Sequence, residues 1–401
     1  MGGMGSVGPD DRILDRRDFL RGAVAAPALL AAPGALAEGA ARRGADDGRP
    51  VGLIARQRDP ENLEFPFSTL EDFLTPTGQF YVRTHFEVPA LEAGSWRLSV
   101  EGAVERPLEL GYDELRRMES RTRTALLECS GNGRVFLKPP QVGVRWELGG
   151  VGNAEWTGVP LAAVLERAGV KPGAVEVILE GADRGEYREP LPRTPGVIPF
   201  ARSLPLERAR RPEVLLAYRM NGAELTPRHG YPVRAIVPGW YGMASVKWLT
   251  RVIVTDRPFD GFFQTFQYTY WERRHGHPSL VPITELEVKS QIARPAPFEA
   301  VPKDSTYRVR GAAWTGDSEV GRVELSTDGG RTWADATLTG ASTRYAWRFW
   351  EHDWRTPARP GPAILMARAT DRRGRVQPMG RDADRRDAMI SHVLPIEVEV
   401  V

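Results

Sequence analysis

Alternation of apolar and polar side chains predicts a series of short strands, with few helices, over residues 61–285. Residues 96–104 alternate in this way and predict a strand with one buried face. Residues 160–168 start with a proline and repeat apolar side chains three and four positions apart, which predicts an amphipathic helix. Similar patterns predict a helix at 112–118 and strands at 122–127, 175–179, 214–220, 233–237 and 246–254, with a loop-rich stretch around Trp146 and Trp156. Because no regular strand–helix–strand units occur, we expect a mixed α+β domain.

After Pro282 the pattern changes to short strands alone. The strands are predicted at 307–314, 322–327, 333–338, 345–350, 364–370 and 393–400. Asp328-Gly329-Gly330 predicts a tight hairpin between two of them. We therefore expect an Ig-like β-sandwich of about seven strands over residues 286–401.

The N-terminus has the pattern of an export signal. Arg16 and Arg17 precede an apolar run that ends in Ala35-Leu36-Ala37, a small-x-small cleavage site, which predicts a twin-arginine signal peptide over residues 1–37. The run is short for a membrane span, although an uncleaved anchor remains an alternative. Residues 38–60 are polar and rich in charge, so we expect a flexible lead. We therefore expect a periplasmic protein, not attached to the membrane after cleavage.

Charge and residue composition exclude several classes of binding site. A formal net charge of +2 gives no reason to expect a nucleic-acid partner. Of 54 basic residues only five are lysines, so each lysine is noteworthy. The single cysteine can form no internal disulfide and no C-x-x-C-H haem motif. The sequence also lacks a P-loop, a dinucleotide-binding glycine motif and zinc-type spacing of His and Cys.

The single cysteine, Cys129, follows a predicted strand and precedes Ser130-Gly131-Asn132-Gly133-Arg134. A thiol beside a flexible backbone and a cation can hold a soft metal together with an anion. We expect Gly131 and Gly133 to let the backbone approach a bulky ligand closely. The alternative is that Cys129 is a small buried apolar residue, as many lone cysteines are.

Other charged residues stand at the starts of predicted strands. His229 and Arg234 flank the strand at 233–237, and Lys247 opens the strand at 246–254. Arg83 lies between apolar residues, where its alternative role is a core ion pair. If these side chains line one cleft, they can grip a phosphate-bearing cofactor.

Several segments, in order, resemble the sulfite oxidase family of molybdopterin-dependent enzymes, in its haem-free bacterial dehydrogenase form. They are the cysteine loop 126–134 and the segments 80–85, 180–183, 215–222, 229–238 and 246–249, while 326–333 resembles the family's dimerisation domain. The resemblance covers about residues 60–400 and implies an α+β catalytic domain, a Mo-molybdopterin cofactor and a homodimer.

The resemblance also implies roles for individual residues. Cys129 corresponds to the thiolate ligand of molybdenum. The cofactor-binding positions correspond to Tyr81, Val82, Arg83, Thr84, His85, Asp183, His229, Arg234, Ser245, Val246 and Lys247. The catalytic pocket corresponds to Arg83, Arg134, Trp146 and Tyr268, with Arg386 as a further arginine from the C-terminal domain. The implied reaction oxidises sulfite to sulfate.

Some features depart from the family pattern. Thr84 stands where the family usually has asparagine, and Gly133 where it often has a second arginine, which makes the pocket less basic. No pattern of a haem-binding domain occurs, so we expect electrons to pass to an external carrier such as a c-type cytochrome. Alternatives are a sulfane-sulfur dehydrogenase, a sulfoxide reductase, which the C-terminal domain disfavours, and a non-catalytic exported Ig-like binding protein.

Overall fold

Strands dominate the fold, with 41% of residues in strands and 12% in helices. The computed structural model describes residues 52–188 and 193–401, which belong to one unit, Ala45–Val401. The α+β class that we expected is therefore met only loosely. The predicted export signal lies outside the described residues.

Part of the expected flexible lead is ordered. Strand β1 pairs with β2 in a small sheet, and Arg56 in β1 forms an ion pair with the buried Glu64 of β2. These contacts give residues 54–57 partners that the sequence pattern did not indicate. The sheet consists of β1 (Ile54–Gln57), β2 (Asn62–Glu64) and β3 (Val82–Arg83).

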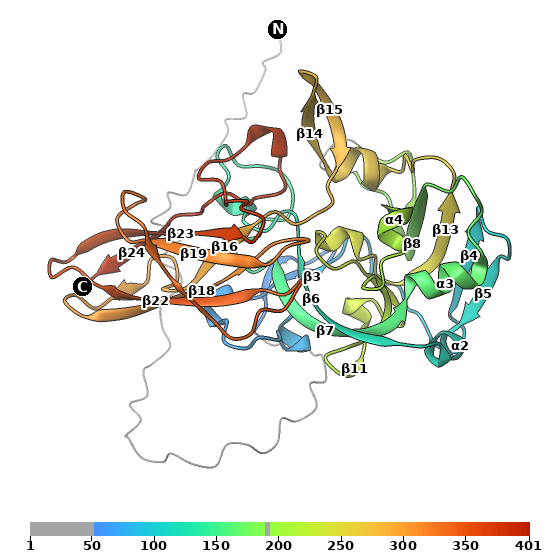
Figure 1. Ribbon diagram of the computed structural model, residues 1–401, viewed down its shortest axis with the longest axis horizontal. Coiled ribbons are helices and arrows are strands. Elements are labelled where there is room, and N and C mark those ends of the chain that lie inside the picture. Colours follow the sequence, from blue (N-terminus) through green and yellow to red (C-terminus); the bar gives the residue numbers. More distant parts are fainter. Residues whose placement is uncertain (1–51, 189–192) are drawn as a thin grey trace, which may run out of the picture. The chain divides into compact units, whose positions relative to one another are not determined.

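Two five-stranded sheets form most of the first part of the chain (Figure 1). In the first, the order is β11-β10-β7-β6, and β12 also pairs with β10. Its strands are β6 (Arg121–Glu128), β7 (Val151–Pro160), β10 (Leu215–Met220), β11 (Ala223–Glu224) and β12 (Arg234–Ile236). In the second, the order is β5-β4-β13-β8-β9, and β13 runs parallel to β4. Its strands are β4 (Arg97–Gly102), β5 (Leu108–Gly111), β8 (Glu176–Gly185), β9 (Ile198–Pro205) and β13 (Leu249–Thr255).

Helices are short. The α-helices are α2 (Tyr112–Arg117), α3 (Leu161–Ala168) and α4 (Leu206–Ala209). Single turns are η1 (Phe67–Thr69), η2 (Thr77–Gln79), η3 (Arg134–Phe136), η4 (Pro227–His229), η5 (Gly242–Ala244) and η7 (Ala383–Arg385), and η6 (Phe263–Gln267) is a π-helix. Helix α3 buries the predicted apolar face and ends at Gly169, whose φ of 69° suits glycine. Among the described residues, no helix has the length and apolar character needed to cross a bilayer.

Strand β7 corrects the expected loop-rich stretch around Trp156. Gly152-Asn153 at the start of β7 is typical of a turn, so the sequence did not indicate a strand there. In the structure, Gly152 and Gly158 allow other residues to pack closely against β7. A Cβ on Gly152 would lie 2.7 Å from the Phe80 ring, and one on Gly158 would lie 2.1 Å from the Leu216 carbonyl oxygen. Strand β13 also differs, because it begins at Leu249 and not at the predicted Val246.

The C-terminal part contains a four-stranded and a five-stranded sheet (Figure 1). The first has the order β16-β18-β22-β21 and the second β17-β24-β23-β19-β20. The predicted strand at 333–338 is in fact two, β20 and β21. The strands are β16 (Lys289–Arg294), β17 (Ala300–Val301), β18 (Thr306–Trp314), β19 (Val320–Ser326), β20 (Ala334–Asp335), β21 (Thr337–Thr339), β22 (Arg348–Arg355), β23 (Gly361–Asp371) and β24 (Ile396–Val400). The Ig-like assignment and the domain limits remain predictions.

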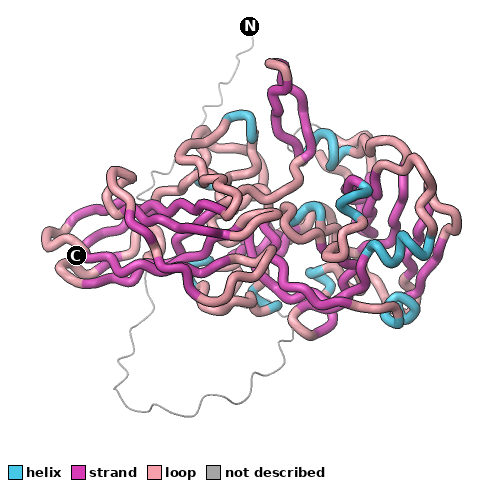
Figure 2. Tube along the Cα trace, in the orientation of Figure 1, coloured by secondary structure: helices cyan, strands magenta, loops and turns pink. Residues whose placement is uncertain are grey.

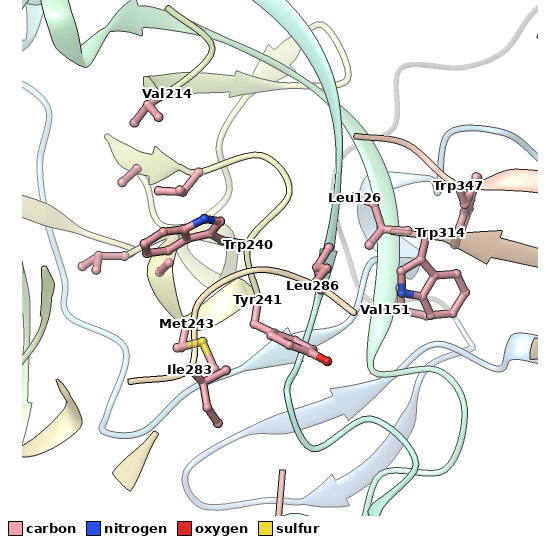
Figure 3. Packing of buried hydrophobic residues seen from close by; sticks show 14 of the residues in the cluster. Leu126, Val151, Val214, Trp240, Tyr241, Met243, Ile283, Leu286, Trp314 and Trp347 are labelled. Carbon is pink, nitrogen blue, oxygen red and sulfur yellow. The ribbon is translucent and has the colours of Figure 1, made fainter. Parts of the chain in front are cut away.

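A hairpin connects these parts. It consists of β14 (Thr269–Arg274) and β15 (His277–Pro282), which pair with each other and extend away from the neighbouring sheets (Figure 2). One buried apolar cluster also runs through both parts. Figure 3 shows Leu126 and Val151 of the first part beside Trp314 and Trp347 of the second.

Candidate functional site

The cysteine loop begins where β6 ends. The Cys129 N–H donates to the carbonyl of Gly150 (2.8 Å), and the Cys129 carbonyl accepts from the N–H of Asn132 (2.8 Å). Cys129 is 8% exposed and lines a cleft. A rigid backbone therefore presents a thiol to an open space.

Most predicted site residues line this cleft. Besides Cys129 they are Tyr81, Arg83, Thr84, His85, Asp183, His229, Arg234, Ser245, Val246, Lys247 and Tyr268. They come from segments far apart in the sequence, brought together by β3, the end of β8, η4, β12 and the segment before β13. Val82, Arg134 and Trp146 do not line it.

Arg83, His85 and Tyr268 form a polar group beside Cys129. The Nε2 of His85 is hydrogen-bonded to the Tyr268 hydroxyl. Burial lowers the pKa of Arg83, but Tyr268 and Cys129 more than offset this, so the Arg83 pKa is raised. Burial, with Arg83 and Lys247 nearby, holds the pKa of His85 well below its usual range. At neutral pH the group therefore presents a cationic guanidinium and a neutral imidazole.

Tyr268 directly follows the π-helix η6. Arg202 lies beneath this turn, donates to the carbonyls of Phe263 and Ile283, and has its guanidinium carbon 5.9 Å from the centroid of the Tyr268 ring. Burial raises the pKa of Tyr268 to about 12, with Arg83 acting in the opposite direction. Tyr268 is thus a protonated hydrogen-bond donor in a fixed position. π-Helical turns are frequent at functional sites.

Further residues of the cleft carry ionisable groups with little access to water. Burial lowers the pKa of Lys247 and raises that of Asp183, and the attraction between the two charges opposes both shifts. Burial also lowers the pKa of Arg234 to about 10, which leaves it charged at neutral pH. His229, whose Nε2 contacts the Thr77 carbonyl (3.1 Å), has a pKa lowered by burial to about 3. Together, the positive charge of Arg234 and the buried polar groups around it favour a polar, anionic ligand.

Arg134, the last residue of the cysteine loop, and Trp146 point away from the cleft lining. Arg134 donates from Nε to the Asp387 carbonyl (2.9 Å) and from Nη1 to the Val144 carbonyl (2.9 Å), so the protein itself occupies the guanidinium that we expected to face an anion. Trp146 is fully buried and packs edge-on against Tyr81, with ring centroids 6.0 Å apart.

The glycines of the cysteine loop lie against other side chains of the protein. A Cβ on Gly131 would lie 2.5 Å from the Arg134 guanidinium, and Gly133 adopts a φ of 99° against Ile390. Both glycines make room for the protein's own side chains, and the close approach of the loop to a ligand stays a prediction.

Arg386 also serves a different contact. Its Nη1 donates to the Phe266 carbonyl (3.1 Å) and to the hydroxyl of Thr269. It therefore braces the turn on either side of Tyr268 from the C-terminal part.

Some cleft residues were not predicted. Arg228 lines the cleft and pairs with Glu61 (2.6 Å), and its position directly before His229 was an available signal. Phe200 stacks on His85 with ring centroids 4.4 Å apart. No local pattern indicates Phe200, because the stacking depends on how β9 packs.

Unpaired polar atoms test whether the cleft suits a cofactor. Of the residues that line the cleft, Ser130 and Asp183 each have one buried oxygen, Oγ and Oδ1, without a hydrogen-bond partner in the described structure. Such groups are costly unless a ligand or water satisfies them. The described chain contains no group of three or more His, Cys, Asp or Glu that could hold a metal, so a metal beside Cys129 needs further ligands from a cofactor. A pterin dithiolene with a phosphate fits this donor set.

Two domain families match the chain. Residues 85–263 match the oxidoreductase molybdopterin binding domain, and residues 281–389 match the Mo-co oxidoreductase dimerisation domain. The cleft residues fall mainly within the first match.

Known proteins agree with these matches. The chain is 38% identical to sulfite oxidase from Gallus gallus, over 83% of this chain and 74% of that protein. It is 34% identical to mitochondrial sulfite oxidase from Drosophila melanogaster, over 81% of this chain, and it spans 59% of that protein, which is less than two thirds. The crystal structure of the sulfane dehydrogenase SoxCD from Paracoccus pantotrophus superposes with a TM-score of 0.74 at 29% identity, covering 87% of each chain. The chain thus belongs to the sulfite oxidase family of molybdopterin-dependent oxidoreductases.

Proposed function

We propose that this protein oxidises sulfite to sulfate and passes the electrons to an external acceptor such as a c-type cytochrome. The observation that carries the proposal is the arrangement of Arg83, His85 and Tyr268 beside Cys129 in the cleft. A buried guanidinium suits a small oxyanion, because it offers several donors in one plane.

The cofactor would be held by Cys129 and by the ionisable residues of the cleft. Cys129 supplies the thiolate, while Lys247, Arg234 and the neutral His229 provide charge and hydrogen bonds for a phosphate and the pterin edge. When bound, the molybdenum cofactor supplies oxygen-atom transfer and two-electron chemistry.

The protein supplies position and proton control. Arg83 stays charged, since its pKa is raised. Its Nη1 donates to the Asn62 amide oxygen and the Thr84 carbonyl, and its other N–H groups would hold the sulfur oxyanion. Tyr268 stays protonated, and the neutral His85 can accept a hydrogen bond from its hydroxyl at Nε2, which fixes the position of the hydroxyl. The buried walls restrict water near the reacting atoms.

Two features support a periplasmic enzyme with a separate electron acceptor. The N-terminal sequence has the twin-arginine pattern that carries folded proteins across a membrane. The single cysteine permits no C-x-x-C-H haem motif within this chain.

The direct test is turnover of sulfite with ferricyanide by purified enzyme that carries about one molybdenum per chain. We expect sulfite-dependent reduction of ferricyanide, and loss of it in Cys129→Ser. A fully loaded enzyme without sulfite turnover would refute the proposed substrate.

A second candidate is a sulfane-sulfur dehydrogenase. Two observations favour it: the structural similarity to the sulfane dehydrogenase SoxCD, and the engagement of Arg134 by Val144 and Asp387, which leaves fewer free cations for an oxyanion. Turnover of a carrier-bound sulfane but not of sulfite would select this candidate.

A further inference from the structure

A buried ion pair stands directly behind Cys129. Glu128, the preceding residue, is 1% exposed, and its carboxylate accepts from Lys289 Nζ (2.8 Å) and Trp314 Nε1 (2.8 Å). Lys289 in β16 and Trp314 in β18 are directly opposite each other in the C-terminal sheet. Side chains from β16 and β18 of the C-terminal part therefore both donate hydrogen bonds to Glu128, the residue next to the proposed metal ligand.

The network continues from this pair to the backbone of Cys129. Asn132 Nδ2 donates to the Glu128 carboxylate (3.1 Å), and Lys289 Nζ donates to the Asn132 carbonyl (3.1 Å). The Asn132 amide oxygen accepts from the N–H of Gly150 (3.0 Å), whose carbonyl accepts from the N–H of Cys129 (2.8 Å). The direction of the thiol thus depends on a chain of contacts that begins at Lys289.

A role in stabilising the contact between the two parts of the chain does not explain the Glu128–Lys289 ion pair. Both side chains are 2% exposed, and the desolvation of two charges can exceed the energy gained from their attraction. Apolar residues of similar volume would join the same surfaces at least as well. Other contacts already attach the loop, because the Met389 N–H donates to the Ser130 carbonyl (2.7 Å).

We propose that Glu128 and Lys289 are positioning residues through which the C-terminal domain fixes the geometry of Cys129 at the metal. The inference rests on Cys129 being the thiolate ligand, as proposed above, and is independent of which sulfur compound is oxidised.

The test compares Lys289→Met, Glu128→Gln and the double variant Glu128→Gln/Lys289→Met in the molybdenum-loaded enzyme. The double variant leaves no unpaired buried charge, so we expect it to fold. We expect an altered Mo(V) electron paramagnetic resonance spectrum and a kcat lowered roughly tenfold to a hundredfold, as is typical when groups that support metal ligands are changed. In the cofactor-free protein we expect faster hydrogen exchange at the amides of Cys129 and Asn132.

A matched control is available in the same interface. Arg208 of α4 forms a partly buried ion pair with Asp317 (2.7 Å), and neither residue is hydrogen-bonded to the cysteine loop in the described structure. We expect Asp317→Asn to lower thermal stability without changing the Mo(V) spectrum. A native spectrum, kcat and exchange rate in the double variant would overturn the inference.

Two further variants keep the outcomes distinct. If the double variant does not fold, Trp314→Phe decides by the same criteria, because it removes one hydrogen bond to Glu128 and keeps an aromatic ring in place. Cys129→Ser tests the ligand assignment separately. A native spectrum in Cys129→Ser would refute that assignment, and with it the basis for the positioning role.

Discussion

At the scale of single residues, burial sets the charge state of the cleft. Lys247 and Lys289, two of the five lysines in the chain, are both buried, and burial lowers the pKa of each. Each has a carboxylate that opposes this shift, Asp183 for Lys247 and Glu128 for Lys289. In a chain that otherwise uses arginine, lysine therefore occurs at two positions where a compact charge meets a buried partner.

Removal of the Tyr268 hydroxyl tests its proposed role. We expect Tyr268→Phe to lower kcat by roughly a hundredfold, the usual contribution of a group that assists proton transfer. Because the Tyr268 pKa is raised to about 12, the native kcat should show no inflection from this group below pH 9. Steady-state kinetics over pH 6–9 measures both effects.

Tyr112→Phe is the control, since Tyr112 is buried against Trp96 and Tyr218 and does not line the cleft. Equal losses of kcat in both variants would contradict a specific role for Tyr268.

His229 should make stability depend on pH. Its folded-state pKa of about 3 lies below the usual 6.5, so the unfolded chain binds more protons between these values, and the free energy of unfolding falls as pH falls. We expect His229→Gln, which can still donate to the Thr77 carbonyl, to make this dependence shallower in cofactor-free protein between pH 7 and 5. Thermal unfolding measures it.

His277→Gln, at an exposed position in β15, should leave the pH dependence unchanged. The same slope in His229→Gln as in the native protein would show that His229 is not buried in its neutral form.

At the scale of elements, periodicity predicts those whose apolar faces are regular. Helix α3 was predicted because its buried side chains follow the helix period. Strand β6 was predicted from a run of residues that favour strands, and its buried residues are consecutive and do not alternate. Strand β7 was missed because glycines replace the side chains that would have shown alternation. Residues 246–248 were wrongly assigned to a strand, since Val246 and Lys247 turn aside to line the cleft.

The sequence predicted part of the candidate site. Ordered motifs indicated which segments meet, and Cys129, Arg83 and Tyr268 do line one cleft. The direction of Arg134 could not be predicted, because it depends on the Asp387 carbonyl, 253 residues further along the chain. Fixing such a contact requires the packed structure of both parts.

The packing of β7 against β10 can be tested with one methyl group. In Gly158→Ala the new Cβ would meet backbone atoms of Leu216 and Ala217, which cannot move aside as a side chain can. We expect a loss of ~1–3 kcal/mol in the free energy of unfolding, the usual cost of overpacking. Denaturant unfolding measures this.

Gly94→Ala is the matched control, because a Cβ at Gly94 has no atom within 4 Å. Equal stability of the two variants would contradict the close approach of β7 and β10.

At the scale of the whole molecule, the match of residues 281–389 to the Mo-co oxidoreductase dimerisation domain predicts a homodimer. We expect light scattering at micromolar concentration to give twice the chain mass of 44.5 kDa. A mass of one chain under these conditions would show that the domain does not pair in solution.

The contacts behind Cys129 also constrain the order in which the protein is made. Four residues late in the chain form hydrogen bonds with the cysteine loop: Lys289, Trp314, Asp387 and Met389. The ribosome adds all four more than 150 residues after Cys129. The loop therefore cannot take its final form until nearly the whole chain has been synthesised. Cofactor insertion must therefore follow translation, and a chain truncated before these residues would lack the contacts that position Cys129.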